Sequence, residues 1–174
     1  MIDLIDYCHR TLTRSAAARS SHDAAGAHAH LRHLDVIQLE NSLILRCIAI
    51  LRYVAGHSDV LSETVTSRML TTTDVPTLVV RLMEQRPWMR PLGDGRFQIY
   101  DNGQWVTSQH PGALEASGRM HPAAAHLWLL FLSLLMSPVA PMKYQLDHHR
   151  CRQLLKVFLS WPFPSSNKMA PRPS

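Results

Sequence analysis

Residues 39–55, with the sequence LENSLILRCIAILRYVA, decide how this chain folds. Polar and small residues recur there at every third or fourth position, which places them on one narrow stripe of an α-helix. The residues of that stripe are Gln38, Ser42, Arg46, Ala49 and Arg52. Almost every other position is large and apolar, and burying each such side chain is worth about 1.5–3 kcal/mol before ordering entropy is subtracted. We therefore predict a central helix that ends at Gly56 and is covered by other helices on several sides.

A second strongly apolar segment begins at Pro122 and ends near Met136. Its most apolar window is shorter than the about 20 residues that a membrane span requires, so we interpret it as a buried helix. Shorter helices are predicted at residues 1–14, 60–70, 75–85, 142–148 and 150–159. The order of a long buried helix, a short helix and an amphipathic helix thus occurs twice, at 39–85 and 122–159. This order is typical of armadillo- or HEAT-like helical repeats.

Local signals predict where several of the shorter helices begin. Ser58 or Asp59 is expected to cap the helix at 60–70, and Asp74 the helix that ends at Gln85. Pro76 lies in the first turn of the latter helix, where a missing N–H costs nothing. In the last helix, the predicted apolar face consists of Leu154, Leu155, Phe158 and Leu159.

Residues 96–107, RFQIYDNGQWVT, have a different pattern. An Asn-Gly pair between β-forming residues is the strongest short-range signal for a hairpin. We therefore predict a β-hairpin inserted between helical units, with Trp88, Phe97 and Trp105 pinning it to the helices. The predicted fold class is all-α, an armadillo/HEAT-like helical repeat with one inserted β-hairpin.

The chain is long enough for one domain with a substantial core, since it has 174 residues of which 46% are hydrophobic. That domain is expected to cover residues 1–160. Residues 15–30 are rich in Ala, Ser, His and Gly and are predicted to form a mobile loop. Residues 161–174 are rich in proline and polar residues and are predicted to be a disordered tail.

Charge and cysteine content argue against a nucleic-acid-binding protein and favour a cytosolic one. The formal net charge of +5 comes from scattered Lys and Arg, without the dense basic run that nucleic-acid binding favours. The three cysteines, Cys8, Cys47 and Cys151, are far apart in the sequence. Such a sparse, odd set is typical of reduced thiols in a cytosolic protein.

No set of residues predicts catalysis or metal binding. Cys8 and His9 are adjacent, and adjacent residues on a helix do not face each other as a nucleophile and base must. The histidines at 22, 28, 30 and 33, and the group His148, His149 and Cys151, lack a complete set of ligands at zinc spacing. We expect no enzymatic activity, no metal and no cofactor.

Aromatic and arginine residues around the hairpin are the candidates for binding another protein, because Trp, Tyr and Arg dominate binding hot spots. The candidates taken as exposed are Trp88, Tyr100, Trp105, Arg81, Arg86, Arg90 and Arg96. Trp88, Arg90, Arg96, Tyr100 and Trp105 are the preferred protein-binding set. The alternative is that Trp88 and Trp105 only hold the hairpin against the helices.

Four stretches of the sequence carry a family resemblance. They are DLIDYCHRTL from Asp3, ILRYVAGHSDVLSETVTSRMLTTTDVPTLVVRLMEQRPW from Ile50, the hairpin ending in QWVT, and WLLFLSLLMSP from Trp128. In order and spacing they resemble the helical region of the zinc finger MYND domain-containing protein 10 family. The resemblance covers most of residues 1–160, and the SRML and final PW segments are its most specific parts.

The resemblance implies an armadillo-like region followed, in the family, by a C-terminal MYND zinc finger. Family members are cytoplasmic, non-enzymatic factors that help to preassemble the dynein motors of cilia and flagella. They act with chaperones, co-chaperones and a leucine-rich-repeat dynein assembly factor, near centriolar satellites or the ciliary base. The three dispersed cysteines of this chain cannot supply a MYND finger, and helices that precede this region in the family have no counterpart. We expect a central fragment or a shortened gene product.

The function expected from the resemblance is that of a cytoplasmic scaffold or co-chaperone for axonemal dynein arms. Its expected partners are chaperones, co-chaperones, the leucine-rich-repeat assembly factor and dynein chains, and neither nucleic acid nor membrane. Two alternatives stay open: a general helical-repeat adaptor, and a nucleic-acid-binding helical repeat, which a steep loss of affinity with salt would reveal.

Overall fold

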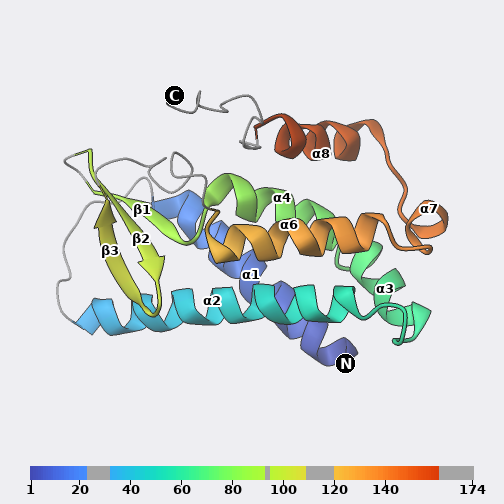
Figure 1. Cartoon of the computed structure of the whole chain (residues 1–174), viewed down its shortest axis with the longest axis horizontal. Coiled ribbons are helices and arrows are strands. Elements are labelled where there is room, and N and C mark those ends of the chain that lie inside the picture. The colour runs from blue at the N-terminus through green and yellow to red at the C-terminus, as the bar shows by residue number, and fades with distance from the viewer. Residues whose placement is uncertain (23–31, 93–94, 109–119, 161–174) are drawn as a thin grey trace, which may run out of the picture.

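The computed structural model describes residues 1–22, 32–92, 95–108 and 120–160. This part of the chain is mostly helical, with a small antiparallel sheet at one end (Figure 1). The helices are α1 (Ile2–His22), α2 (Arg32–Gly56), α3 (Glu63–Leu70), α4 (Val75–Gln85), α6 (Pro122–Leu135), α7 (Ala140–Lys143) and α8 (His148–Ser160). The strands are β1 (Met89–Pro91), β2 (Phe97–Asp101) and β3 (Gln104–Ser108). The prediction of a mainly helical chain with a hairpin is confirmed, although the sheet has a third strand.

The long helix α2 lies along one edge of the molecule, with α6 beside it and α1 crossing behind (Figure 1). Its buried side chains, among them Ile48 and Leu51, face these two helices. The prediction that other helices cover α2 is confirmed on this side. It is wrong for Leu39 and Leu43, which are exposed because α2 lies at the edge of the bundle.

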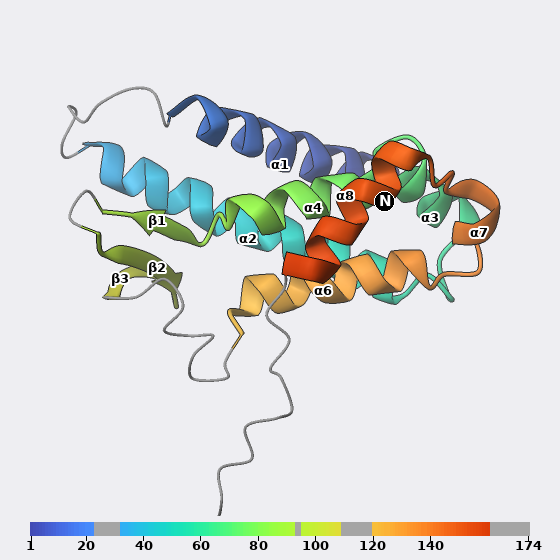
Figure 2. The same ribbon diagram turned by 90° about the horizontal axis from the view of Figure 1, so that it is seen from above.

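The helix α6 begins at Pro122 and ends at Leu135, as predicted. Leu127, Leu130, Phe131 and Leu134 are all fully buried in the core. Seen from above, α4 lies between α1 and α6, and α8 lies over α4 (Figure 2). These helices bury one continuous hydrophobic core, which supplies most of the stabilising free energy of the fold.

The first helix extends further than predicted. Residues 15–22, predicted as part of a loop, belong to α1, which corrects that prediction. Ala16 is buried, and the side-chain amide of Gln85 donates a hydrogen bond to its carbonyl oxygen at 3.0 Å. Alanine has the highest helix propensity, so an Ala-rich run remains helical once α4 offers it a surface. Residues 23–30 of the predicted loop, and the predicted tail 161–174, lie outside the described residues.

Helix α3 begins later than predicted, because Ser62 and not Ser58 or Asp59 is its N-cap. Residue Val60 is 74% exposed and so gains nothing from a helical position there. Arg68 on α3 forms a two-pronged ion pair with Asp6 on α1, with N···O distances of 3.0 and 2.6 Å. This pair holds α3 against the first helix and lowers the pKa of the Asp6 carboxyl.

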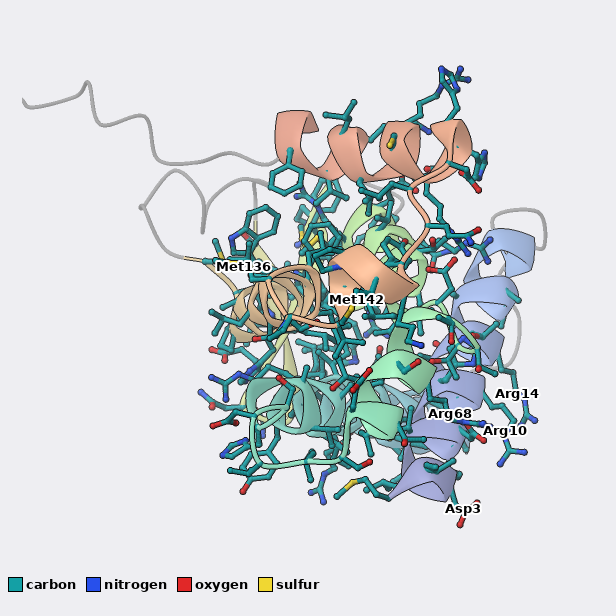
Figure 3. All side chains as sticks on the ribbon, turned by 90° about the vertical axis from the view of Figure 1, so that its right-hand side faces the viewer. Asp3, Arg10, Arg14, Arg68, Met136 and Met142 are labelled. Atoms are coloured by element: carbon teal, nitrogen blue, oxygen red, sulfur yellow. The ribbon has the colours of Figure 1, made fainter. Side chains whose placement is uncertain are left out.

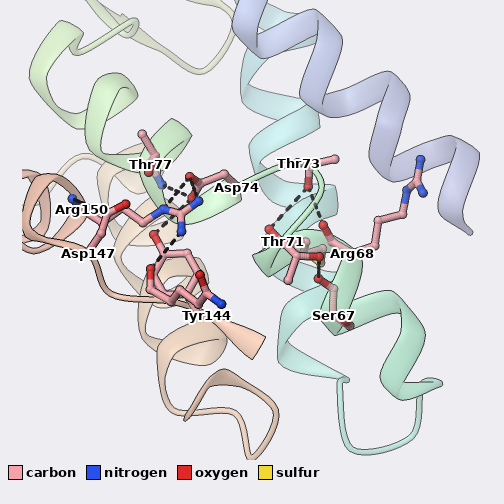
Figure 4. A network of polar contacts seen from close by, with 11 residues as sticks. Ser67, Arg68, Thr71, Thr73, Asp74, Thr77, Tyr144, Asp147 and Arg150 are labelled. Carbon is pink, nitrogen blue, oxygen red and sulfur yellow. Dashed lines mark hydrogen bonds and ion pairs between the residues drawn. The ribbon is translucent and has the colours of Figure 1, made fainter. Parts of the chain in front are cut away.

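The predicted cap of α4 is confirmed. Asp74 Oδ1 accepts a hydrogen bond from the backbone N–H of Thr77 at 3.4 Å, and Pro76 lies in the first turn. The same carboxylate accepts hydrogen bonds from Tyr144 Oη at 3.2 Å and Arg150 Nε at 3.2 Å (Figure 4). Burial raises the pKa of Tyr144 to about 12, so its hydroxyl remains a donor. One residue thus caps α4 and ties α7 and α8 to it.

The C-terminal helices differ from the prediction in their bounds and in one face. The short helix α7 is Ala140–Lys143, not 142–148, and α8 begins at His148. Leu154 and Val157 of α8 are buried, whereas Leu155 is exposed, which corrects its predicted place on the apolar face. Phe158 is also exposed, at 39%, although its ring packs on Trp128 of α6 at 5.2 Å between centroids.

The sheet has the strand order β1-β2-β3, and both pairs are antiparallel. Its β2–β3 turn is the predicted Asn102-Gly103 pair, with φ of 48° and 85°. Two positive φ values define the tight turn that matches strand twist, and Asn and Gly adopt them at low cost. Strand β1 was not predicted, because three residues that include Arg90 and Pro91 carry too little β pattern.

Candidate interaction surface

The five predicted protein-binding residues all belong to the sheet or to the turn that leads into it. The strand register brings Arg90 of β1 opposite Gln98 of β2, and Gln98 opposite Thr107 of β3. Tyr100 and Trp105 form the next pair on the same face of the hairpin. Residues separated by 15 positions in sequence therefore share one face of the sheet.

Trp88 is buried, with 3% of its surface exposed, which corrects the expectation that it is accessible. Its ring stacks on the imidazole of His121 at 5.4 Å between centroids, with 4° between the ring planes. His121 is the N-cap of α6. Trp88 thus joins the end of the α4 turn to the start of α6.

Tyr100 is also buried, at 5% exposed, which corrects its predicted exposure. Its ring meets Trp105 edge-on at 5.2 Å between centroids. Its hydroxyl donates to the carbonyl oxygen of Gln38 on α2 at 3.5 Å, and its backbone N–H donates to the carbonyl of Trp88 at 2.8 Å. The side-chain amide of Gln38 in turn donates to the carbonyl of Gly103. Tyr100 therefore fastens the hairpin to α2.

His121, which the sequence analysis did not single out, completes this attachment. Its Nδ1 accepts a hydrogen bond from the backbone N–H of Ala123 at 3.1 Å, so the proton lies on Nε2. Nε2 donates to the carbonyl oxygen of Tyr100 at 2.8 Å. Burial lowers the pKa of His121, and both ring nitrogens are used only in the neutral form. Its position directly before Pro122, at a helix N-cap, is the signal that could have identified it.

The guanidinium of Arg90 lies over the ring of Trp105, with 4.2 Å from its Cζ to the ring centroid. Its Nε donates to Gln98 Oε1 at 2.7 Å, which fixes the plane of the guanidinium. The side-chain amide of Gln98 donates to Thr107 Oγ1 at 3.3 Å. Partial burial lowers the pKa of Arg90, but a guanidinium stays charged. A positive, planar group is thus held in one orientation on an aromatic ring.

Arg96, one residue before β2, is exposed, and Trp105 is partly exposed. We call Arg90, Arg96, Gln98, Trp105 and Thr107 the Arg90–Trp105 surface. Of the five predicted residues it keeps Arg90, Arg96 and Trp105 as accessible groups and omits Trp88 and Tyr100, which are buried. This surface places a fixed cation beside an aromatic ring, and both are residue types that are common in binding hot spots.

The environment of Cys8 does not favour nucleophilic chemistry. Cys8 and Cys47 are both buried between α1 and α2, and their side chains are hydrogen-bonded to each other. Burial raises the pKa of the Cys8 thiol and raises that of Cys47 to about 12, so both stay protonated. Within the described ranges there is no group of three or more His, Cys, Asp or Glu arranged to hold a metal. Nor does this part contain a helix with the length and apolar character to cross a bilayer.

Comparison with known proteins finds distant relatives of this chain, among them a protein of the fruit fly. Over 169 residues the chain is 27% identical to the zinc finger MYND domain-containing protein 10 homolog of Drosophila melanogaster. The matched region is 90% of this chain and 35% of the fly protein, so the chain spans about a third of that protein's length. Neither a protein-family model nor a solved structure matches the chain. The resemblance carried by the quoted stretches is thus confirmed as a distant homology, over nearly the whole chain, to part of that protein.

Proposed function

We propose that the chain is a non-enzymatic scaffold for the preassembly of axonemal dynein arms, acting in the cytoplasm by binding other polypeptides. The observation that carries this proposal is the distant homology to a zinc finger MYND domain-containing protein 10 homolog over 90% of the chain. The proposed partners are chaperones, co-chaperones, a leucine-rich-repeat assembly factor and dynein chains. Nucleic acid and membranes are not among them.

The proposed architecture is armadillo-like. Two helical series follow one another, α2–α3–α4 and α6–α7–α8, each beginning with a long helix and continuing with a short one. The leading helices α2 and α6 pack side by side and run in the same direction (Figure 1). Parallel stacking of equivalent helices is how such repeats bury a continuous core, and this supports the assignment.

The Arg90–Trp105 surface is the proposed binding site for a partner. Gln98 and Trp105 already set the orientation of Arg90. Binding a partner therefore does not cost the conformational entropy of ordering this long side chain. Because arginine and tryptophan are the commonest hot-spot residues, a few such contacts can dominate an interface. Tyr100 is buried against the edge of Trp105 and is not proposed as a contact residue.

The test is affinity purification of the tagged chain from a flagellated cell, with identification of the bound proteins. Dynein heavy chains and chaperones are the expected result. Arg90→Ala should reduce their recovery and leave the melting temperature nearly unchanged, because a partly exposed cation–π pair contributes only about 0.5–1 kcal/mol. Arg14→Ala on the outer side of α1 is the matched control and should leave recovery unchanged (Figure 3).

Two results would overturn the proposal in different ways. If neither dynein chains nor assembly chaperones are recovered, the proposed role in dynein assembly is wrong, and a general helical-repeat adaptor is the favoured alternative. Equal recovery with Arg90→Ala and Arg14→Ala would show that partners bind elsewhere on the molecule.

A further inference from the structure

The solvent-facing side of α2 is largely apolar, apart from the exposed Glu40 and Arg46. Val36, Leu39, Leu43 and Tyr53 are 50%, 71%, 36% and 61% exposed. Ile50 lies between them in sequence and is partly buried. Soluble monomers rarely expose apolar side chains in a continuous row, and such rows commonly mark sites where another molecule binds.

The spacing of these residues is regular. Residues 36, 39, 43, 46, 50, 53 and 57 alternate steps of three and four, which is the a/d repeat of a coiled-coil seam. The row extends over about 32 Å at 1.5 Å per residue, enough to hold a partner helix of about 20 residues. At its end, the rings of Tyr53 and His57 are 4.1 Å apart, and His57 Nδ1 is 2.8 Å from the carbonyl oxygen of Tyr53. We call this row the α2 seam.

Arg46 occupies the centre of the α2 seam and is exposed. Its neighbours one turn away on the helix are Leu43 and Ile50 along the seam, and Ser42 and Ala49 beside it. None of these carries a negative charge, and no carboxylate in the described part of the chain forms an ion pair with Arg46. The seam therefore presents one unpaired positive charge at the midpoint of an apolar row.

This charge discriminates between possible occupants. Any two-fold pairing of two copies that uses the whole seam brings the two Arg46 side chains within about one helical turn of each other, whether the helices run parallel or antiparallel. Like charges in a desolvated seam oppose association, and shifting the register to separate them shortens the contact. A helix with a carboxylate at the facing position has the opposite effect, since it pairs with Arg46 as the apolar residues close around it.

We infer that the α2 seam binds an amphipathic helix of a partner protein that carries Glu or Asp opposite Arg46. Helix-in-groove binding of this kind uses apolar anchors for affinity and a central charge for register and specificity. The inference rests on the proposed function in that both require the chain to bind polypeptides. It uses a surface that is separate from the Arg90–Trp105 surface.

A charge-swap experiment with designed peptides tests the inference. The probe is a fluorescent helical peptide of about 20 residues with Glu at the central d position and Leu at its other a and d positions. A control peptide has Lys in place of this Glu. Fluorescence anisotropy with the whole chain should give roughly tenfold tighter binding of the Glu peptide. Arg46→Glu should reverse this preference, and Arg14→Glu on α1 should leave it unchanged. Leu39→Asp should abolish binding of both peptides while the circular dichroism spectrum stays helical, because Leu39 is largely exposed.

Three outcomes of the peptide experiment would overturn the inference. They are failure of both peptides to bind, equal binding of the two, and a preference that Arg46→Glu does not alter. A wild-type dimer in sedimentation that Leu39→Asp dissociates would also overturn it, by making a second copy the occupant. In each case, recovery of dynein chains in the affinity purification would leave the proposed function standing, so the two failures are distinguishable.

Discussion

The two ends of α2 are held in place by different kinds of contact. Toward its C-terminal half, Leu51 and Val54 pack into an apolar core formed with α1 and α6. Toward its N-terminal half, Gln38 is bonded to the hairpin, which in turn is bonded to His121 at the start of α6. The first end depends on the volume of its side chains, whereas the second depends on directional bonds and on one neutral imidazole. Substitutions at the two ends should therefore differ in their effect and in their pH dependence.

The largest effect is expected at the sheet end. Trp88→Ala should reduce the free energy of unfolding by about 3–5 kcal/mol, because a large buried ring that stacks on His121 is lost. Urea denaturation at pH 7.5 measures this change. Trp105→Ala, at a partly exposed position, is the matched control and should cost less. A cost for Trp88→Ala below about 1 kcal/mol would mean that the sheet unfolds separately from the helices.

The apolar end gives the next effect. Leu51→Ala should cost about 2–5 kcal/mol, because the side chain is 0% exposed and its surroundings cannot collapse fully around the cavity. On the opposite side of the same helix, Leu39→Ala should change stability by less than about 0.5 kcal/mol. Equal costs for the two substitutions would contradict the division of α2 into a covered and an open side.

The cap of α4 offers a smaller test of directional bonding away from the sheet. Asp74→Ala should cost about 1–2 kcal/mol, because Thr77 loses its cap and Arg150 loses its ion pair. Asp59→Ala is the control, since Asp59 is exposed and caps no helix of the structure. Thermal unfolding of the two variants in parallel gives the comparison. If Asp74→Ala and Asp59→Ala have equal melting temperatures, the bonds made by Asp74 do not contribute measurably to stability.

The smallest expected effect concerns pH. His121 has a pKa lowered by burial, whereas in the unfolded chain it titrates near its ordinary value of 6.5. The unfolded state therefore binds more protons in this range, and stability falls as the pH drops below 6.5 toward the lower folded pKa. Urea midpoints at pH 7.5 and 5.5 should differ less in His121→Gln than in the wild type.

A second histidine contributes to the same pH range. Burial also lowers the pKa of His9, on α1 and away from the sheet. His9→Gln combined with His121→Gln separates the two shares of the pH dependence. If the stability of the double variant changes with pH as much as that of the wild type, neither imidazole causes the pH dependence.

Signals that act over a few residues were enough to predict local features of this fold. The Asn102-Gly103 turn, the Asp74 cap and the start of α6 at Pro122 all agree with the structure, because each depends on backbone geometry set by adjacent residues. The same holds for the apolar content of α2 and α6, which requires that both helices bury a face. Arg90, Arg96 and Trp105 of the Arg90–Trp105 surface were also candidates from composition, whereas Gln98, Thr107 and the arrangement of the five residues were not predicted.

Only the tertiary structure decided which of those residues are accessible and which side of each helix is covered. Tyr100 and Trp88 are buried because Gln38 and His121, far away in sequence, lie against them. Residues 15–22 are helical because α4 provides a partner for Ala16, and Leu39 is exposed because α2 lies at the edge of the bundle. Periodicity along a chain states that a face is apolar, but burial depends on which elements pack against that face, and this is determined by contacts distant in sequence.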